Sequence, residues 1–150
     1  MLNEEILKLK GENEEELEDV NIELNFPRFL PDNYIEKNEK IKIYKRALAL
    51  KTFEELEDLH KELEDRFGRL KSEAKGFFEF LKIRIRAREL GIVSIKEDKE
   101  KRLLINFNEE KINVDKIIYL LANKKISYLK FTQTIGFEGD IFEFFDLYSN

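Results

Sequence analysis

The spacing of apolar residues changes along the chain, and each change predicts a different kind of secondary structure. Val20, Ile22 and Leu24 alternate with polar residues, which predicts a short strand. Pro27 and Pro31 follow, and they favour an extended or turning segment, because proline lacks the amide donor and restricts the residue before it. The pattern therefore predicts a strand and a turning segment before the first helix.

Three helices are predicted in the middle of the chain. Asn38 can cap the first. Thr52 and Glu55 form a capping box that opens the second, and Gly68 closes it. The third ends at Gly91. The residues expected to face a core are, helix by helix, Ile41, Tyr44 and Leu48, then Phe53, Leu56, Leu59, Leu63 and Phe67, and finally Ala74, Phe78, Leu81 and Ile85.

The C-terminal half favours strands. Apolar runs at residues 92–95 and 103–107 flank a charged turn, which predicts a hairpin. Asn113 caps a short helix, and a last helix is expected at residues 141–148. Between them a strand is expected at residues 126–131, with a continuation at 134–137. The apolar residues of the short helix are Val114, Ile117, Ile118 and Leu121.

The predicted order of elements is β-α-α-α-β-β-α-β-α. It describes an α+β fold in which a small antiparallel or mixed sheet packs against about five helices. Residues 20–150 would form this domain. Residues 1–10 are interpreted as the end of a helix from a preceding domain, so that the chain would begin inside that helix. Residues 11–19 hold six acids in nine positions and are interpreted as an acidic linker.

The composition argues against a membrane-spanning, a secreted or a nucleic-acid-binding protein. A chain of 150 residues is one domain by the usual size range, and it has no cysteine for disulfides or thiol chemistry. No apolar run approaches the roughly 18 residues that span a bilayer, and the acidic N-terminus is unlike a secretory signal, so we expect a cytoplasmic protein. Acids outnumber lysine and arginine by five, which argues against binding of a phosphate backbone by the domain as a whole.

The candidate catalytic residues are few. His60 is the single histidine, and with no cysteine or second histidine it lacks the usual partners of a zinc site. No serine lies in a nucleophile-elbow pattern, and the six glycines form no phosphate-binding loop. We therefore expect a domain with no catalytic residues, no metal and no cofactor of its own. We also expect the isolated domain to be a monomer.

The predicted second helix carries an acidic stripe. Asp58, Glu62 and Asp65 stand at i, i+4 and i+7, so they share one helix face, where like charges repel. A basic partner facing the stripe would relieve this repulsion. The alternative is local pairing of Glu62 with Arg66 and of Asp65 with Arg69, both at i, i+4.

The third helix carries a basic run that includes Arg84, Arg86 and Arg88. Because the helical period continues through the run, these side chains spread around the helix and do not form one face. They either pair with acids of the same domain or form a basic surface for nucleic acid. The aromatic end of the chain, with Phe142, Phe144 and Phe145, is either core or a docking surface.

Several of these motifs occur together in one known family. The chain resembles the C-terminal domain of bacterial transcription-repair coupling factor (Mfd). The resemblance covers most of residues 1–122, and nothing is carried over from residues 133–150. It rests on the Leu-Pro-Asp turn in Phe29–Ile35, the Tyr44–Arg46 motif, the acidic helix that ends in Asp65-Arg66-Phe67-Gly68, Leu90–Ile92, and the opening at residues 4–12.

The resemblance implies a function. Members of the family are ATP-driven, Mg²⁺-dependent translocases on double-stranded DNA that displace stalled RNA polymerase and recruit UvrA for nucleotide excision repair of damaged DNA. Their C-terminal domain is a regulatory clamp that packs on a UvrB-like module within the same protein, hides its UvrA-binding surface and restrains the motor. Glu62 and Asp65 match the family's contact positions, with Asp58 beside them on the stripe. A free-standing nucleic-acid-binding module that uses Arg84, Arg86 and Arg88 is the alternative.

Overall fold

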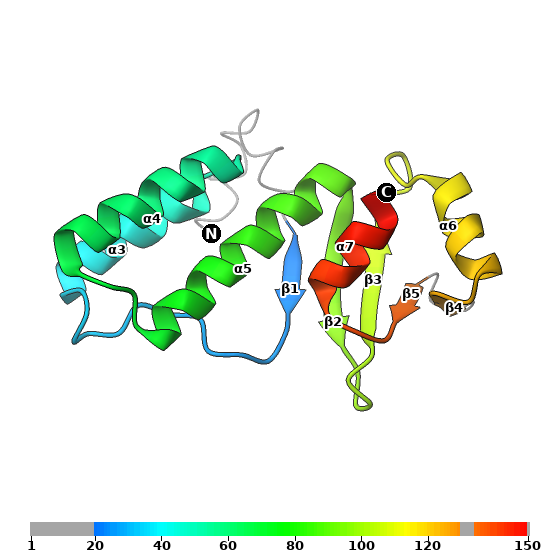
Figure 1. Ribbon diagram of the computed structural model, residues 1–150, viewed down its shortest axis with the longest axis horizontal. Coiled ribbons are helices and arrows are strands. Elements are labelled where there is room, and N and C mark those ends of the chain that lie inside the picture. The colour runs from blue at the N-terminus through cyan, green and yellow to red at the C-terminus, as the bar shows by residue number, and fades with distance from the viewer. Residues whose placement is uncertain (1–19, 130–133, 150) are drawn as a thin grey trace, which may run out of the picture. The chain divides into compact units, whose positions relative to one another are not determined.

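The computed structural model describes residues 20–129 and 134–149. The predicted helix end at residues 1–10 and the acidic linker at 11–19 lie outside these residues. The described residues form two compact units. One is helical and holds residues 25–86, and the other contains the sheet and holds residues 20–24, 87–129 and 134–149 (Figure 1).

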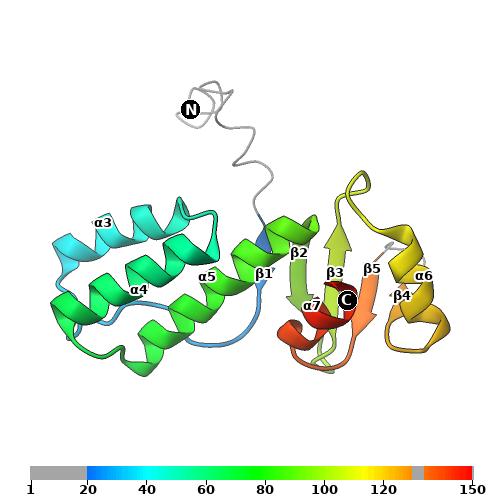
Figure 2. The same cartoon turned by 45° about the horizontal axis from the view of Figure 1, so that its top comes forward.

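The helical unit consists of three helices that lie alongside one another (Figures 1 and 2). They are α3 (Lys37–Leu48), α4 (Phe53–Phe67) and the part of α5 (Ser72–Leu90) up to residue 86. The predicted core faces of α4 and α5 are confirmed at Leu56, Leu59, Leu63, Ala74, Phe78, Leu81 and Ile85, all of which are buried.

The predicted core face of α3 is wrong in two respects. Ile41 and Leu48 are about half exposed, and the buried residues are Ile43 and Ala47. The small side chain of Ala47 lets a neighbouring helix approach closely. The helix therefore buries the face with Ile43 and Ala47, and the face with Ile41 and Leu48 remains exposed. The residue before the helix is Glu36, which makes no side-chain cap, and Asn38 lies within the first turn.

The segment before α3 packs tightly on α5. Gly76 lies against the chain at Pro27, and a Cβ atom at position 76 would stand 1.7 Å from the Pro27 carbonyl oxygen. Nearby, the Phe29 amide donates to the Glu73 carbonyl at 3.2 Å. Gly76 is therefore a close-approach glycine, which permits contact between two backbones.

The other unit is built on a sheet of five strands among the described residues, in the order β1-β2-β3-β5-β4. The strand β1 pairs in parallel with β2, and the other neighbours are antiparallel. The segment 126–137, predicted as one strand with a continuation, forms the two paired strands β4 and β5. The strands are β1 (Asn21–Glu23), β2 (Ile92–Glu97), β3 (Leu103–Phe107), β4 (Ser127–Leu129) and β5 (Thr134–Phe137).

Two short helices accompany this sheet, α6 (Val114–Ala122) and α7 (Ile141–Ser149). The ring of Phe144 is fully buried and packs against Phe107 of β3 and Phe137 of β5. The hydroxyl of Tyr148 accepts a hydrogen bond of 2.7 Å from the Asn113 amide at the start of α6. The helix α7 therefore lies on the sheet face that carries these aromatic residues.

The α+β class, the mixed sheet and the order of elements agree with the prediction from the sequence. Among the described residues, no helix combines the length and the apolar character needed to cross a membrane.

Candidate functional site

The acidic helix α4 begins at a well-formed cap. The Thr52 hydroxyl accepts a hydrogen bond of 3.1 Å from the Glu55 amide, as a capping box requires. The Glu55 carboxylate reaches back one residue further than in the usual box, because it accepts from the Lys51 amide at 2.8 Å. Two backbone donors at the start of α4 are thus satisfied by side chains.

The far end of α4 is fixed by Gly68 and Tyr34. Gly68 has φ of +92°, a conformation that favours glycine, and its amide donates to the Glu64 carbonyl at 3.0 Å. The Tyr34 hydroxyl donates to the Gly68 carbonyl at 2.7 Å, and burial raises the pKa of this hydroxyl. The Asp-Arg-Phe-Gly ending therefore stops the helix and anchors it to the segment that precedes α3.

The Tyr44–Arg46 motif supports the same region. The Tyr44 hydroxyl accepts a hydrogen bond of 2.8 Å from the Leu30 amide, and its ring packs edge-on against Phe77 at 5.1 Å. Two residues later on α3, Arg46 reaches the acidic stripe of α4. Two of the motifs that carry the family resemblance, Phe29–Ile35 and Tyr44–Arg46, thus contact the third, the acidic helix α4.

Glu62 is held by two arginines. Its carboxylate lies 2.7 Å from an Arg46 guanidinium nitrogen and 3.5 Å from one of Arg66, which also pairs with Glu39 at 3.1 Å. The hydrogen bond from Arg46 is the main cause that lowers the pKa of the Glu62 carboxyl. The side chain of Glu62 remains 35% exposed, so one edge of this network faces solvent. The predicted local pair with Arg66 is present, whereas the pair with Arg46, which joins two helices, was not predicted.

Asp65 differs from Glu62. Its side chain is exposed, and in the described part of the chain its carboxylate has no hydrogen bond and no ion pair, so the local pair with Arg69 does not form. Asp58 is also exposed and has no such partner in the same residues, although its charge contributes to raising the pKa of Arg46. The stripe thus contains one carboxylate that is already paired and two that remain available.

His60 makes packing and polar contacts with its neighbours. Its ring lies 5.1 Å from that of Phe78 on α5, and its Nε2 atom is 3.3 Å from the Glu64 carboxylate one turn along α4. Within residues 20–129 and 134–149, no three His, Cys, Asp or Glu side chains are grouped so that they could hold a metal ion.

The basic run does not form the surface that the alternative requires. Arg84 is 5% exposed and donates to the Leu48 carbonyl at 3.0 Å, so the prediction of Arg84 on a basic surface is wrong. Arg86 and Arg88 are half-buried. Arginines two residues apart on a helix point in different directions, so the three do not share one face. Arg84 is the one that faces the end of α3. Of the aromatic residues near the C-terminus, Phe144 and Phe145 are core, whereas Phe142 is half-buried.

Comparison with known proteins gives a consistent result. A family model described as the TRCF domain matches residues 24–117. The transcription-repair-coupling factor of Borreliella burgdorferi is 37% identical over 124 residues, which is 81% of this chain and 11% of that protein. That of Escherichia coli is 34% identical over 150 residues, covering 91% of this chain and 13% of that protein. The chain thus spans a small fraction of the length of these relatives.

The fold has a solved counterpart. A crystal structure described as the C-terminal domain of transcription-repair coupling factor has a TM-score of 0.70 to this chain at 19% identity, and the match covers 87% of each. At that identity the likeness supports the fold alone. The family model, in contrast, covers more than half of the chain, and the relatives share its sequence at over 30% identity. The chain therefore belongs to the transcription-repair-coupling factor family.

Proposed function

We propose that this chain is a non-catalytic regulatory domain at the C-terminal end of a transcription-repair coupling factor. It restrains the DNA translocase of the same protein and masks the UvrA-binding surface of the UvrB-like module through α4. Support comes from family membership and from the two exposed carboxylates, Asp58 and Asp65, which lack ion-pair partners in the described residues. The availability of Asp65 is the observation that carries the proposal.

The chemistry of the motor belongs to other parts of the longer protein in this proposal. The chain spans only 11% and 13% of the two relatives compared above. We assign the binding of ATP, Mg²⁺, double-stranded DNA, RNA polymerase and UvrA to the full-length protein. This domain needs no cofactor of its own in the proposal. The direct partner of α4 is the UvrB-like module.

The contact works as a lock with two states. Asp58 and Asp65 pair with basic side chains of the module in the closed state, and Glu62, held by Arg46 and Arg66, extends the acidic surface. Each solvent-accessible pair contributes about 1 kcal/mol at most. Tethering in one chain raises the effective concentration of the contact, so a few weak pairs suffice to close it. The same weakness lets polymerase engagement shift the population to the open state.

ATP hydrolysis by the full-length protein tests the restraint. Asp58→Asn and Asp65→Asn together remove the free charges and break no ion pair within the described residues. We expect basal hydrolysis, measured without RNA polymerase, to rise severalfold. Glu57→Gln is the matched control, because Glu57 is exposed on the same helix but lies off the stripe. A double variant with wild-type basal hydrolysis would count against the lock.

A nucleic-acid-binding module remains the alternative function, now supported only by Arg86 and Arg88. A DNA titration of the chain at low salt separates the two. With Arg84 buried and a net charge of −5, we expect weak binding or none. Tight binding that falls steeply with added salt, and that is lost in Arg86→Gln, would favour the alternative.

A further inference from the structure

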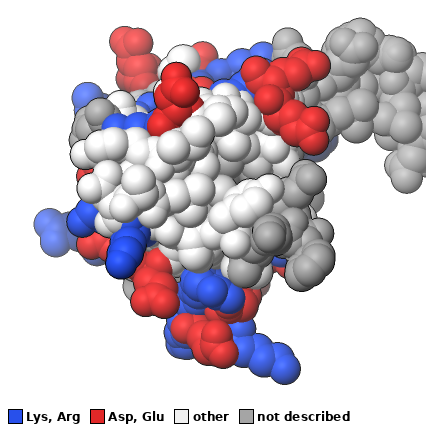
Figure 3. Space-filling model, turned by 90° about the vertical axis from the view of Figure 1, so that its right-hand side faces the viewer, with Lys and Arg blue, Asp and Glu red and all other residues white. Residues whose placement is uncertain are grey.

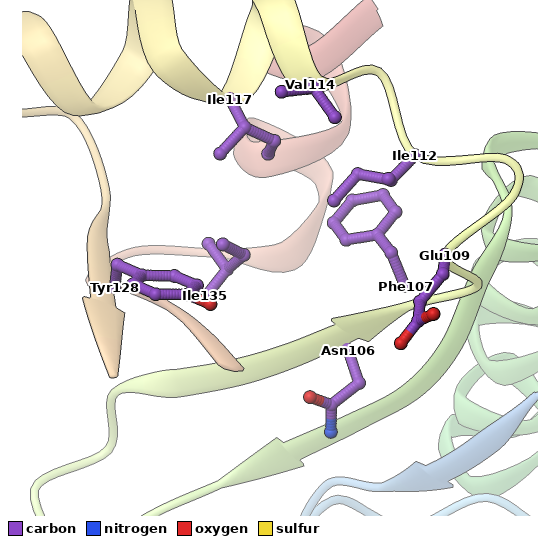
Figure 4. Close-up of a pocket in the computed structure, with 8 residues that line it drawn as sticks. All are labelled: Asn106, Phe107, Glu109, Ile112, Val114, Ile117, Tyr128 and Ile135. Carbon is purple, nitrogen blue, oxygen red and sulfur yellow. The ribbon is translucent and has the colours of Figure 1, made fainter. Parts of the chain in front are cut away.

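The sheet-containing unit has an apolar pocket that the proposed function does not use. It has a volume of about 350 Å³ and lies between α6, the strands β3, β5 and β4, and the loop after β3 (Figure 4). Its apolar walls are formed by Phe107, Ile112, Val114, Ile117, Tyr128 and Ile135. In the close-up, Val114 and Ile117 project from α6 toward the side of the pocket that Phe107 and Ile112 form (Figure 4).

The pocket opens onto an apolar part of the surface. Val114 is 56% exposed, Ile118 on the next turn of α6 is 57% exposed, and Tyr128 on β4 is 48% exposed. Of the apolar residues of α6, Ile117 is buried, whereas Val114 and Ile118 are not. Figure 3 shows a broad area without charged residues on the sheet-containing unit, with acidic and basic side chains around it. Large apolar side chains gathered on a surface in this way are typical of interaction sites.

One charged group lies at the pocket. Glu109 contributes to the lining and is exposed, and among the described residues its carboxylate accepts no hydrogen bond and forms no ion pair. The other polar lining residue, Asn106, is already engaged. Its amide donates to Ser94 at 2.9 Å and accepts from Thr134 at 2.9 Å. The group left to recognise a charged ligand is therefore the Glu109 carboxylate.

The sheet offers a backbone beside the pocket. The strand β4 stands last in the sheet order, so within the described residues its outer edge has no neighbouring strand. Tyr128 lies in the middle of β4 and lines the pocket. An extended segment that paired with this edge could place a side chain in the pocket, because such segments gain affinity from backbone hydrogen bonds and specificity from side-chain pockets.

We propose that this pocket binds an extended segment of a partner protein that carries an aliphatic or aromatic residue next to a lysine or arginine. The apolar side chain fills the space between Val114, Ile117 and Tyr128, and the basic one pairs with Glu109. A second copy of this chain fits less well, since a symmetric contact would bring two Glu109 carboxylates to the same interface. The net charge of −5 also favours a basic partner.

Selection from a library of random linear peptides displayed on phage, with the whole chain as the target, tests the proposal. We expect the selected peptides to share an apolar residue beside a basic one. Tyr128→Ser should weaken the best synthetic peptide about tenfold or more, as loss of a buried aromatic contact does. Glu109→Lys should weaken it up to about fivefold, as expected for an exposed ion pair. Fluorescence anisotropy measures both affinities.

Two matched controls are available. Tyr119→Ser removes a tyrosine that is 58% exposed on α6 outside this pocket, and Glu110→Lys makes the same charge change one residue along. Both should leave the affinity within about twofold of wild type. Because all four side chains are exposed, thermal unfolding should show that each variant remains folded.

Three results would overturn the proposal. The selection could yield no peptide with the apolar and basic pair. The selected peptides could bind Tyr128→Ser and Glu109→Lys as tightly as wild type. Sedimentation could show that the chain dimerises and that Tyr128→Ser returns it to a monomer, which would make a second copy the occupant. None of these readouts depends on α4, so they are independent of the proposed lock.

Discussion

The acidic residues of α4 have different environments although they share one helix face. Glu62 is paired with Arg46 and Arg66, whereas Asp65 has no partner in the described residues. A substitution of Glu62 therefore changes contacts inside this domain as well as any contact outside it. Asp65 is the cleaner residue with which to probe the proposed lock.

The pairing of Glu62 predicts a pH-dependent contribution to stability. Arg46 holds the pKa of the Glu62 carboxyl below its ordinary value of 4.5. The stabilisation is therefore fully present above that value and is lost as the pH falls through the lowered pKa of the folded state. We expect Glu62→Gln to lower the free energy of unfolding by about 0.5 kcal/mol at pH 7 and to have a smaller effect near pH 2. Urea denaturation at both pH values measures this difference.

Asp65→Asn serves as the control for this measurement. Because Asp65 has no ion pair in the described part of the chain, its neutralisation should leave the free energy of unfolding unchanged at either pH. An equal loss of stability in the two variants at pH 7 would contradict the assignment of the Arg46–Glu62 pair.

At this scale the sequence predicted only local pairs. The Glu62–Arg66 pair follows from i, i+4 spacing on one helix and is present. The stronger partner, Arg46, lies on α3, and periodicity alone does not say which residues of two helices meet. The burial of Arg84 has the same cause, because its environment is set by the chain around Leu48 and by the helices around α5.

Among the elements, α4 follows most directly from the sequence. Its cap, its buried leucines and its glycine stop were all predicted, since each is a local signal. The face of α3 was predicted less well. Its Ile41 is exposed, and so is Ile118 on α6, because an apolar pattern does not say how many of its residues the core can accept.

The cap of α4 gives a prediction at the scale of the element. Thr52→Ala removes the hydrogen bond from the Glu55 amide and should cost about 1 kcal/mol in the free energy of unfolding. Thr52→Ser retains the hydroxyl and should cost much less. Urea denaturation with an unchanged m-value distinguishes loss of the cap from a change in the unfolded state. If alanine and serine had the same effect, the hydroxyl would not be the source of the stabilisation.

At the scale of the whole molecule, the fold class was predictable because strand and helix periods differ along the chain. The apolar pocket below α6 was not, since it is lined by residues from separate elements that become neighbours only in the folded unit. The candidate site on α4 was identified from the sequence and the structure together. Residue spacing predicted the acidic stripe, and the ion pairs of the structure distinguish the paired Glu62 from Asp58 and Asp65.

The central claim concerns a contact within a longer protein, so its most direct test is the affinity of that protein for UvrA. Replacing Asp58 and Asp65 with arginine removes the proposed ion pairs and places positive charges against the basic side chains that we expect on the UvrB-like module. If the two lost pairs contribute about 1–2 kcal/mol together, UvrA should bind the double variant roughly 5–30 times more tightly than the wild type. Glu57→Arg should bind as the wild type does. Equal affinity of the wild type and the double variant for UvrA would contradict the account.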